Sequence, residues 1–179
     1  MNNYLVVDLE ATCSDDNSVP KREMEIIEIG AVLVDGFTLE AVDEFQSFVR
    51  PIRHGQLAAF CTELTSIEQS DVDEAPGFKD VVKEMKGWMY GSDTFTFCSW
   101  GDYDHKQLVQ DCDLHGIAYP MPGGHINLKR AFSAKQGIAK KLGMAGALAH
   151  VGIELTGTHH RGIDDARNIA KLLPWCVDT

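Results

Sequence analysis

Two acidic residues, one position apart, stand in the first apolar stretch of the sequence, YLVVDLEAT (residues 4–12). Side chains alternate between the two faces of a strand, so Asp8 and Glu10 are expected on one face and Leu9 on the other. Asp is uncommon inside strands, and two neighbouring carboxylates repel each other unless a cation compensates them. Because Mg²⁺ binds carboxylate oxygens, the pair predicts a divalent-metal platform. The competing interpretation is an edge strand with one face in water.

A second acidic centre is SWGDYDHKQL (residues 99–108), where Asp102 and Asp104 compete for one role. The helix predicted over 101–116 has a core-facing side made of His105, Leu108, Val109 and Cys112. Asp104 stands four residues before Leu108 and therefore falls on the inward side. Asp102 stands at the predicted helix start, where it can serve as the N-cap. Helical phase favours Asp104 and leaves Asp102 as the alternative.

The last helix, predicted over 163–175, begins with two adjacent aspartates. Asp165 is in line with Ile169 and Leu172, so its carboxylate is expected on the core side. The neighbouring stripe of the helix is polar and is expected to face solvent with its charges paired: Asp164, Arg167, Asn168 and Lys171. Of the doublet, Asp165 is the candidate for chemistry.

Two adjacent histidines precede this helix. His160 lies closer to the helix than His159, and Gly162 is expected to let the chain turn tightly between them and the helix. Taken alone, however, a histidine pair in a loop is weak evidence for a site.

The elements that must position these residues predict an α/β fold with a mixed central sheet flanked by helices. Three strands come first and, with short connections, are expected to form an antiparallel meander: residues 4–12, 25–35 and 40–51. The third of these alternates well enough to be half-buried. Further segments follow: a helical pattern over 65–90, a strand over 94–100 and helices over 101–116, 144–152 and 163–175. We expect a single domain over residues 1–179.

In the helical pattern, the apolar positions recur at helical spacing: Phe78, Val81, Val82, Met85, Trp88 and Met89. A loop over ELTSI (residues 63–67) is expected before it.

Composition limits the partners and the compartment. The formal net charge of −11 disfavours a nucleic-acid partner, since phosphate binding relies on Lys and Arg. Residues 114–153, however, contain no Asp or Glu and carry five basic residues, which would allow a polyanionic partner or simply form an exposed face. The five cysteines are scattered without a CxxC pair, which favours a reducing, cytoplasmic setting over a disulfide framework or structural zinc. No apolar run is long enough to span a membrane.

Several common catalytic motifs are missing from the sequence. Without GxxxxGK[ST], GxGxxG, HExxH or GxSxG, there is no local support for nucleotide triphosphate hydrolysis, dinucleotide binding, zincin chemistry or a hydrolase nucleophile elbow.

Taken together, the acidic motifs resemble those of a known family. An Asp-x-Glu strand, an aromatic-Asp-x-x-x-Leu segment after a later strand and a His-x-Gly-x-x-Asp segment before the last helix are similar to the DEDDh 3′-to-5′ exonucleases, which have a ribonuclease H-like fold. The resemblance runs over residues 4–173. FCTELTSI, SWGDYD, HINLKRAF and HHRGIDDARNIA resemble the RNA-trimming branch, whose members process the 3′ ends of histone mRNA, small RNA and ribosomal RNA. Some members carry an extra nucleic-acid-binding domain at the N-terminus, and the expectation from residues 1–179 is an exonuclease domain without it.

The resemblance implies a set of roles. Asp8, Glu10, Asp104 and Asp165 would bind two Mg²⁺ or Mn²⁺ ions, and His160 would be the general base. This agrees with the choice of Asp104 and Asp165 by helical phase. The activity implied is metal-dependent hydrolysis of RNA from its 3′ end, at single-stranded ends or short overhangs, with release of 5′-nucleoside monophosphates.

The resemblance also implies contacts with the terminal nucleotide from Ala11, Thr12, Leu64, Thr65 and His160, although turn formation and core packing would explain the first four equally well. Upstream backbone contacts could come from Lys129, Arg130 and Arg161. A DNA proofreading exonuclease and an inactive nucleic-acid-binding scaffold of the same fold are the alternatives, and the sequence predicts no particular protein partner.

Overall fold

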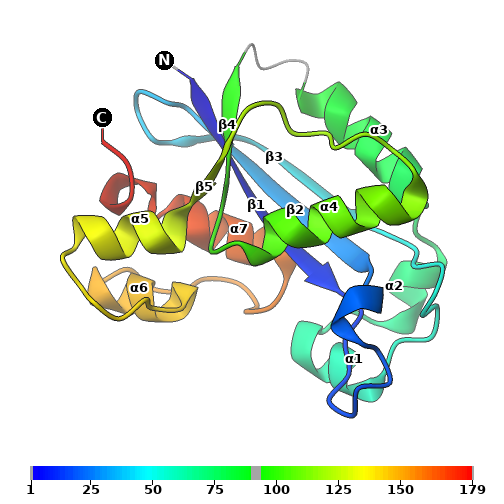
Figure 1. Ribbon diagram of the computed structural model, residues 1–179. Helices are drawn as coiled ribbons and strands as arrows, with labels where there is room; N and C mark the ends of the chain where they lie inside the picture. The colour runs from blue at the N-terminus through cyan, green and yellow to red at the C-terminus, as the bar shows by residue number, and fades with distance from the viewer. Residues whose placement is uncertain (1, 90–93, 179) are drawn as a thin grey trace.

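The computed structural model describes residues 2–89 and 94–178, and its centre is a five-stranded mixed sheet (Figure 1). The strand order is β3-β2-β1-β4-β5. β1 pairs antiparallel with β2 and β2 with β3, whereas β4 runs parallel to β1 and β5 parallel to β4. The strands are β1 (Asn3–Ala11), β2 (Ile26–Val34), β3 (Ala41–Phe48), β4 (Phe95–Ser99) and β5 (His125–Asn127). The predicted antiparallel meander and mixed sheet are confirmed.

The position of β1 decides between the two interpretations of its carboxylates. It is the middle strand of the sheet, so the edge-strand interpretation of Asp8 and Glu10 is wrong. The actual edge is β3, where only Phe45 is fully buried, and the expected half-buried strand is therefore largely exposed. β5, at the other edge, was not predicted because three residues are too few to show alternation.

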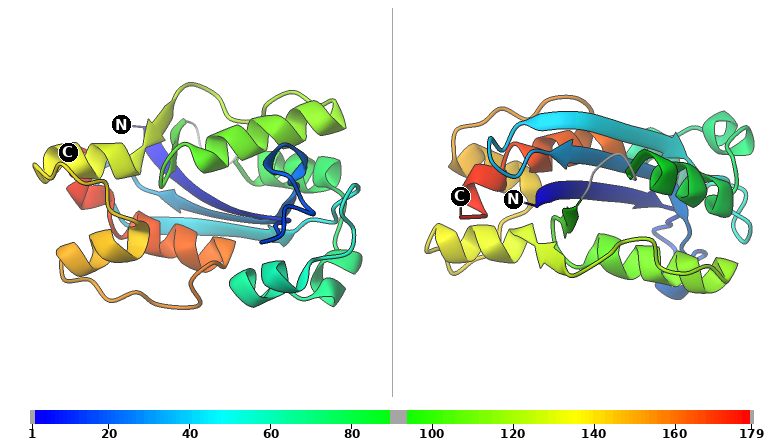
Figure 2. Two further views of the ribbon diagram at one scale, coloured as in Figure 1. Left: turned by 60° about the horizontal axis from the view of Figure 1, so that its bottom comes forward. Right: turned by 90° about the horizontal axis from the view of Figure 1, so that it is seen from above.

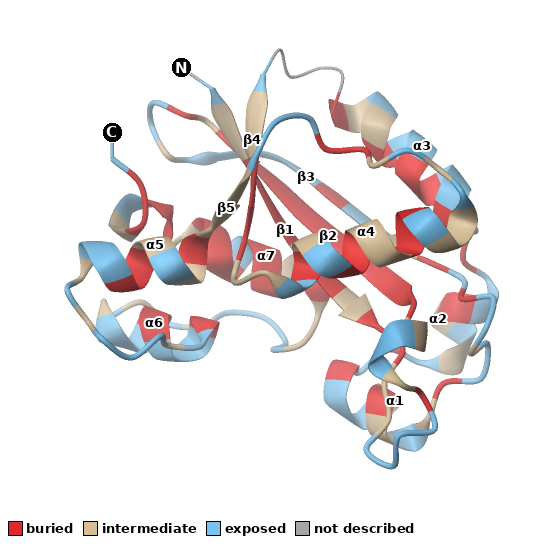
Figure 3. Ribbon diagram, viewed as in Figure 1, coloured by how far each residue is buried: buried red, intermediate tan, exposed pale blue. Residues whose placement is uncertain are grey.

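The helices flank this sheet. Figure 2 shows α4 and α7 on opposite sides of it. Leu5, Val7 and Leu9 of β1 pack with α3 and α4, while Val6, on the opposite face, packs with α5, α6 and α7. The helices are α1 (Ala59–Thr65), α2 (Gln69–Asp73), α3 (Phe78–Met89), α4 (Tyr103–His115), α5 (Leu128–Lys135), α6 (Met144–His150) and α7 (Gly162–Ala170). Figure 3 shows the buried residues concentrated in the central strands and on the sheet-facing sides of the helices.

The helical pattern over 65–90 is divided in the structure. α2 and α3 are separate because Pro76 and Gly77 interrupt the pattern, and Tyr90 lies outside the described residues. The apolar side of α3 is confirmed, except that Trp88 is only half-buried and its indole nitrogen donates to Asp43 at 3.0 Å. A loop was expected over residues 63–67, but residues 63–65 belong to the end of α1, a helix that was not predicted.

α4 differs in part from its predicted core face. Leu108 and Cys112 are buried as expected, but His105 and Val109 are only half-buried. Polar side chains take their place in the buried set: Asp104, Gln107 and Asp111. The helix ends, as expected, at a left-handed Gly116 with φ of 62°.

Within residues 2–89 and 94–178, no helix is both long and apolar enough to cross a membrane.

Candidate active site

The candidate site lies at the carboxyl end of β1. Asp8 and Glu10 share the face of β1 that also carries Val6, and this face is covered by α7. The pairing with β2 shifts directly after Glu10, which lies opposite Glu28, whereas Ala11 lies opposite Ile26. Such a bulge bends a strand locally and redirects its side chains. The strand is therefore irregular where its second carboxylate projects.

Two glycines allow α7 to approach the sheet closely. A Cβ atom on Gly30 of β2 would lie 2.1 Å from the carbonyl carbon of Gly162, and one on Gly162 would lie 3.1 Å from the carbonyl oxygen of Asp8. No real side chain fits at the first position. Gly162 was expected to permit a turn, but its φ is not positive, and the left-handed residue is His160, with φ of 65°. The glycine serves close packing of backbone on backbone instead.

This close approach brings Asp165 of α7 to the carboxylates of β1. Ligand oxygens of Asp8, Glu10 and Asp165 all lie within 4.8 Å of one another. Asp165 is 5% exposed, as its helical phase predicted. Its Oδ2 accepts a hydrogen bond from the backbone N–H of His160 at 3.0 Å. Its Oδ1 is buried and has no hydrogen-bond partner among the described residues.

The structure separates Asp104 from Asp102. Asp104 is 4% exposed, and its Oδ1 accepts from the backbone N–H of Leu9 at 3.1 Å, so it is attached to β1 between the two strand carboxylates. Asp102 occupies the N-cap position of α4 but makes no side-chain capping bond. Instead it accepts from Asn127 at 2.8 Å and from Arg130 at 3.0 Å. Of the two aspartates, Asp104 is the one that the structure brings to β1.

The electrostatics of the cluster show an excess of negative charge. Burial, followed by Asp104 and Glu10, holds the pKa of Asp8 well above its usual range. Burial, followed by Asp165, raises the pKa of Glu10 to about 9, and burial raises that of Asp104 to about 6. An oxygen-only donor set with one unpartnered oxygen and uncompensated charge fits a hard divalent cation. The residues present therefore suit Mg²⁺ or Mn²⁺.

The two histidines stack beside this cluster. Their ring centroids are 4.0 Å apart, and His159 Nε2 is 3.8 Å from Asp165 Oδ2. Burial, followed by the neighbouring His159, lowers the pKa of His160, so its ring is neutral at pH 7. The histidine pair is weak evidence in the sequence, but the fold places both rings at the carboxylate that the helix contributes.

Glu28 is a buried carboxylate that the sequence interpretation missed. It accepts from Arg161 Nε at 3.1 Å and from the backbone N–H of Gly162 at 2.9 Å, and so ties the start of α7 to β2. Arg161, suggested as a contact to the upstream backbone of a substrate, pairs with Glu28 and lies 5.2 Å from the ring centroid of Phe48. The signal was available, because Glu28 is the only charged residue in an otherwise apolar strand, as Asp8 and Glu10 are in theirs.

The predicted exposure of Asn168 is also wrong. The polar stripe of α7 was expected to face solvent, and the pairing of Arg167 with Asp164 at 3.1 Å agrees with it. Asn168, however, is fully buried and donates to the carbonyls of Thr156 (2.8 Å) and Asp164 (2.9 Å). Its amide fastens the preceding loop to the helix, which helical phase alone could not indicate.

The residues expected at the terminal nucleotide divide into two kinds. Ala11 and Thr12 are buried, and the hydroxyl of Thr12 accepts from the backbone N–H of Glu25 at 2.9 Å. Thr65 is also buried and donates to the carbonyl of Cys61 at 2.8 Å. Leu64 is the exception, since it is 37% exposed at the end of α1.

Tyr103, the aromatic residue of the aromatic-Asp-x-x-x-Leu motif, is another apolar surface near the site, and no role was predicted for it. It immediately precedes Asp104 and is 46% exposed. Burial of the hydroxyl, followed by the charges of Asp104 and Glu10, raises the pKa of its phenol.

Comparisons with known proteins agree with this geometry. Residues 5–173 match the model of the exonuclease family RNase_T. ERI1 exoribonuclease 3 of Mus musculus is 34% identical over 95% of this chain and 52% of its own length. The 3′-5′ exoribonuclease 1 of Homo sapiens is 32% identical over 93% of this chain and 50% of its own. The chain thus spans about half the length of these curated relatives.

Among solved structures, the nuclease domain of 3′hExo, described as a DEDDh family member bound to rAMP, is 32% identical with a TM-score of 0.89. The alignment covers 96% of this chain and 90% of that one. The expected ribonuclease H-like exonuclease fold is therefore confirmed.

Proposed function

The chain belongs to the exonuclease family, and from that membership we propose that it hydrolyses phosphodiester bonds from the 3′ end of RNA, one nucleotide at a time. The observation that carries the proposal is the cluster of Asp8, Glu10 and Asp165, whose ligand oxygens lie within 4.8 Å of one another. Asp104, hydrogen-bonded to the same strand, completes four carboxylates at one strand end.

We propose that these four carboxylates hold two Mg²⁺ or Mn²⁺ ions. The raised pKa values of Asp8, Glu10 and Asp104 support this, because burial and then mutual repulsion raise them, and a bound cation would offset both. When bound, two such ions supply positive charge to the scissile phosphate and stabilise the attacking and leaving oxygens.

In this proposal His160 is the general base. Its lowered pKa keeps the imidazole neutral at pH 7, and a neutral ring can accept the proton of the attacking water. The hydrogen bond from its backbone N–H to Asp165 holds the residue beside the carboxylates. The bond between the terminal phosphorus and the 3′ oxygen of the preceding nucleotide breaks, which leaves a new 3′ hydroxyl and a 5′-nucleoside monophosphate.

RNA is the proposed substrate because both curated relatives are named exoribonucleases and one similar structure, 31% identical, is of histone mRNA stem-loop recognition by a 3′-exonuclease. Exposed Leu64 and Tyr103 offer apolar surface for the terminal base. The buried threonines, Thr12 and Thr65, would act by shaping the adjoining backbone. A cytoplasmic setting is proposed as well, on the support of five cysteines that are all free thiols.

The test is cleavage of 5′-labelled single-stranded RNA and DNA oligomers of one sequence with Mg²⁺, with Mn²⁺ or with a chelator. We expect a one-nucleotide ladder with RNA and either metal, and intact oligomers with the chelator. Preferential cleavage of DNA would support the proofreading alternative. Intact RNA and DNA under all ion conditions would refute the exonuclease proposal and leave the inactive scaffold.

Asp104 in the first turn of α4 and Asp102 at its N-cap position provide a matched pair for the site assignment. Asp104→Asn is expected to reduce turnover at least roughly 100-fold, because it removes a metal-binding oxygen. Asp102→Asn is expected to retain turnover within about threefold, since Asp102 contacts Asn127 and Arg130 instead. Equal losses in the two variants would contradict the assignment.

A further inference from the structure

A second group of candidate metal ligands lies beside the four carboxylates. Ligand atoms of His159, His160 and Asp165 all lie within 4.8 Å of one another. Asp165 is 5% exposed, and its Oδ1 has no hydrogen-bond partner among the described residues. A buried carboxylate with one unpartnered oxygen and two nearby imidazole rings makes a mixed oxygen and nitrogen donor set, whereas the proposed magnesium ligands are oxygens alone.

The loop that carries the histidines is fixed at both ends. The backbone N–H of Thr158 donates to Asp164 Oδ2 at 2.9 Å, and that of Arg161 donates to the carbonyl of Thr158 at 3.2 Å. The backbone N–H of His160 donates to Asp165 at 3.0 Å. The two histidines are therefore held next to the carboxylate before any ligand binds.

The distances suit a tetrahedral ion. Two ligands that each lie about 2.0–2.2 Å from zinc in tetrahedral geometry are roughly 3.4 Å apart. His159 Nε2 and Asp165 Oδ2 are 3.8 Å apart, so a shift of a few tenths of an ångström would bring them to that separation. The imidazole planes now stack at 19°, and both ring nitrogens can face one ion only after a ring rotates. The side chain of His159 is 45% exposed, so the proposed rotation is assigned to this ring.

Nitrogen donors also determine which ion is preferred. Mg²⁺ prefers oxygen ligands, whereas imidazole suits borderline transition metals, and two histidines with one carboxylate make a common zinc donor set. We propose that His159, His160 and Asp165 form a Zn²⁺ site that inhibits the enzyme. Because Asp165 belongs to both groups of ligands and His160 is the proposed base, zinc at this site removes both from the reaction. The inhibitory part rests on the proposed nuclease function, whereas the zinc site itself does not.

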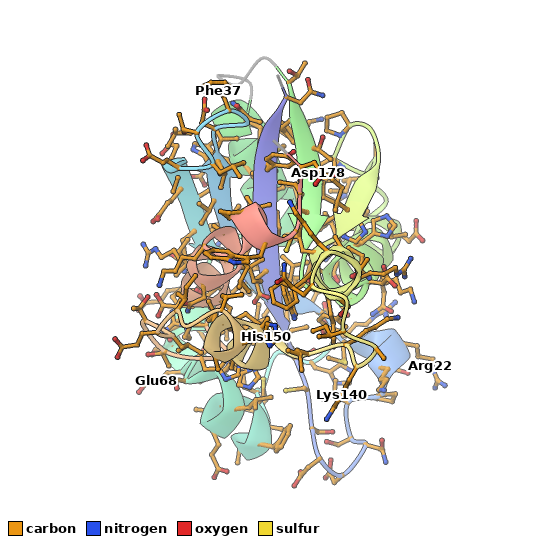
Figure 4. All side chains as sticks on the ribbon, turned by 90° about the vertical axis from the view of Figure 1, so that its left-hand side faces the viewer. Arg22, Phe37, Glu68, Lys140, His150 and Asp178 are labelled. Carbon is orange, nitrogen blue, oxygen red and sulfur yellow. The ribbon has the colours of Figure 1, made fainter. Side chains whose placement is uncertain are left out.

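The first experiment measures binding by isothermal titration of Zn²⁺ into the protein in saturating Mg²⁺. We expect one zinc site, and we expect His159→Gln to weaken it tenfold or more, since the variant removes a ligand but leaves the four acidic residues intact. The matched control is His150→Gln on α6, an exposed histidine labelled in Figure 4, which is expected to keep wild-type affinity. Zinc affinity of His159→Gln within twofold of wild type would overturn the proposal.

The second experiment follows RNA cleavage at constant Mg²⁺ with increasing Zn²⁺. With each rate expressed relative to the same variant's zinc-free rate, His159→Gln is expected to need at least ten times more Zn²⁺ for half-inhibition than the wild type or His150→Gln. An unchanged half-inhibitory concentration would show that zinc acts at the carboxylates alone and would overturn the inhibitory role. If no variant cleaves RNA, the nuclease proposal fails, while the calorimetric result still decides whether the zinc site exists.

Discussion

Two sets of buried carboxylates lie next to each other in this sheet, and they differ in what compensates their charge. Glu25 accepts from the backbone N–H groups of Ile52, Arg53 and His54 at 2.7–3.0 Å. Glu28 is bound by Arg161 and by the N–H of Gly162. Each negative charge of this set is surrounded by hydrogen-bond donors.

On the neighbouring strand, Asp8 and Glu10 face Asp165, no Lys or Arg among the described residues pairs with them, and their pKa values are raised. Burial alone therefore does not distinguish a structural carboxylate from a functional one. The difference lies in whether the protein itself supplies the donors. Where it does not, an external cation must, and the fold is expected to be less stable without it.

The largest expected effect comes from Asp8→Asn. Turnover is expected to fall at least about 1,000-fold, because a metal ligand is lost. The metal-free protein is expected to become more stable, by about 1 kcal/mol, because repulsion among the carboxylates decreases. RNA cleavage and urea unfolding in a chelator measure the two quantities. The exposed Asp113→Asn serves as the control for both, and a destabilised Asp8→Asn would contradict the metal-site interpretation.

Glu28→Gln tests the set of carboxylates whose charge is compensated by hydrogen-bond donors of the protein itself. The variant leaves Arg161 without its buried partner, and the free energy of unfolding is expected to fall by about 3 kcal/mol. Glu44→Gln is the control, because Glu44 pairs with Arg167 at 2.6 Å on the surface and an exposed pair contributes less than about 1 kcal/mol. Urea unfolding of both variants measures the contrast. Similar losses of unfolding free energy in the two variants would contradict a structural role for Glu28.

Gly30→Ala tests the approach of α7 to the sheet. The added methyl would lie 2.1 Å from the backbone of Gly162, so α7 must move away and carry Asp165 with it. We expect a loss of about 1–3 kcal/mol in stability and a clear loss of Mg²⁺ affinity by calorimetry. Gly87→Ala in α3, where a methyl meets nothing within 4 Å, is the control and should not be destabilised. Unchanged Mg²⁺ affinity in Gly30→Ala would contradict this account of the site.

The smallest effect is a dependence of stability on pH. The pKa of Asp104 is raised to about 6 and that of Glu10 to about 9, so the folded metal-free protein retains protons that the unfolded chain has released. Stability must then fall as pH rises from about 5 to 9. The melting temperature in a chelator should decrease by several degrees over this range, and Mg²⁺ should flatten the curve. A melting temperature that rises with pH would contradict the raised pKa values.

Helical and strand periodicity predicted a large part of the site. Asp8 and Glu10 were placed on one face by the two-residue repeat of a strand, and Asp104 and Asp165 were chosen over their neighbours by helical phase. Periodicity works for these residues because it depends on one element at a time. It could not show that α7 would pack against β1 or that Glu28 would bind Arg161, since both depend on contacts between distant segments.

Roles that depend on a particular hydrogen bond were predicted least well. Asn168 was predicted to be a surface residue because its neighbours in the helix are polar. Its buried amide, however, donates hydrogen bonds to the carbonyls of Thr156 and Asp164. Gly162 looked like a turn residue, yet it permits contact between two backbones. A one-dimensional pattern does not contain the position of the partner atom, which decides both cases.

The backbone of His160 carries a consequence for how this sequence would change under selection. Its left-handed φ of 65° is uncommon for any residue with a side chain and costs about 1 kcal/mol relative to a residue that adopts it freely. Glycine or asparagine would be favoured at position 160 if thermal stability alone were selected. A library screened for melting temperature should therefore replace this histidine, whereas one screened for RNA cleavage should retain it.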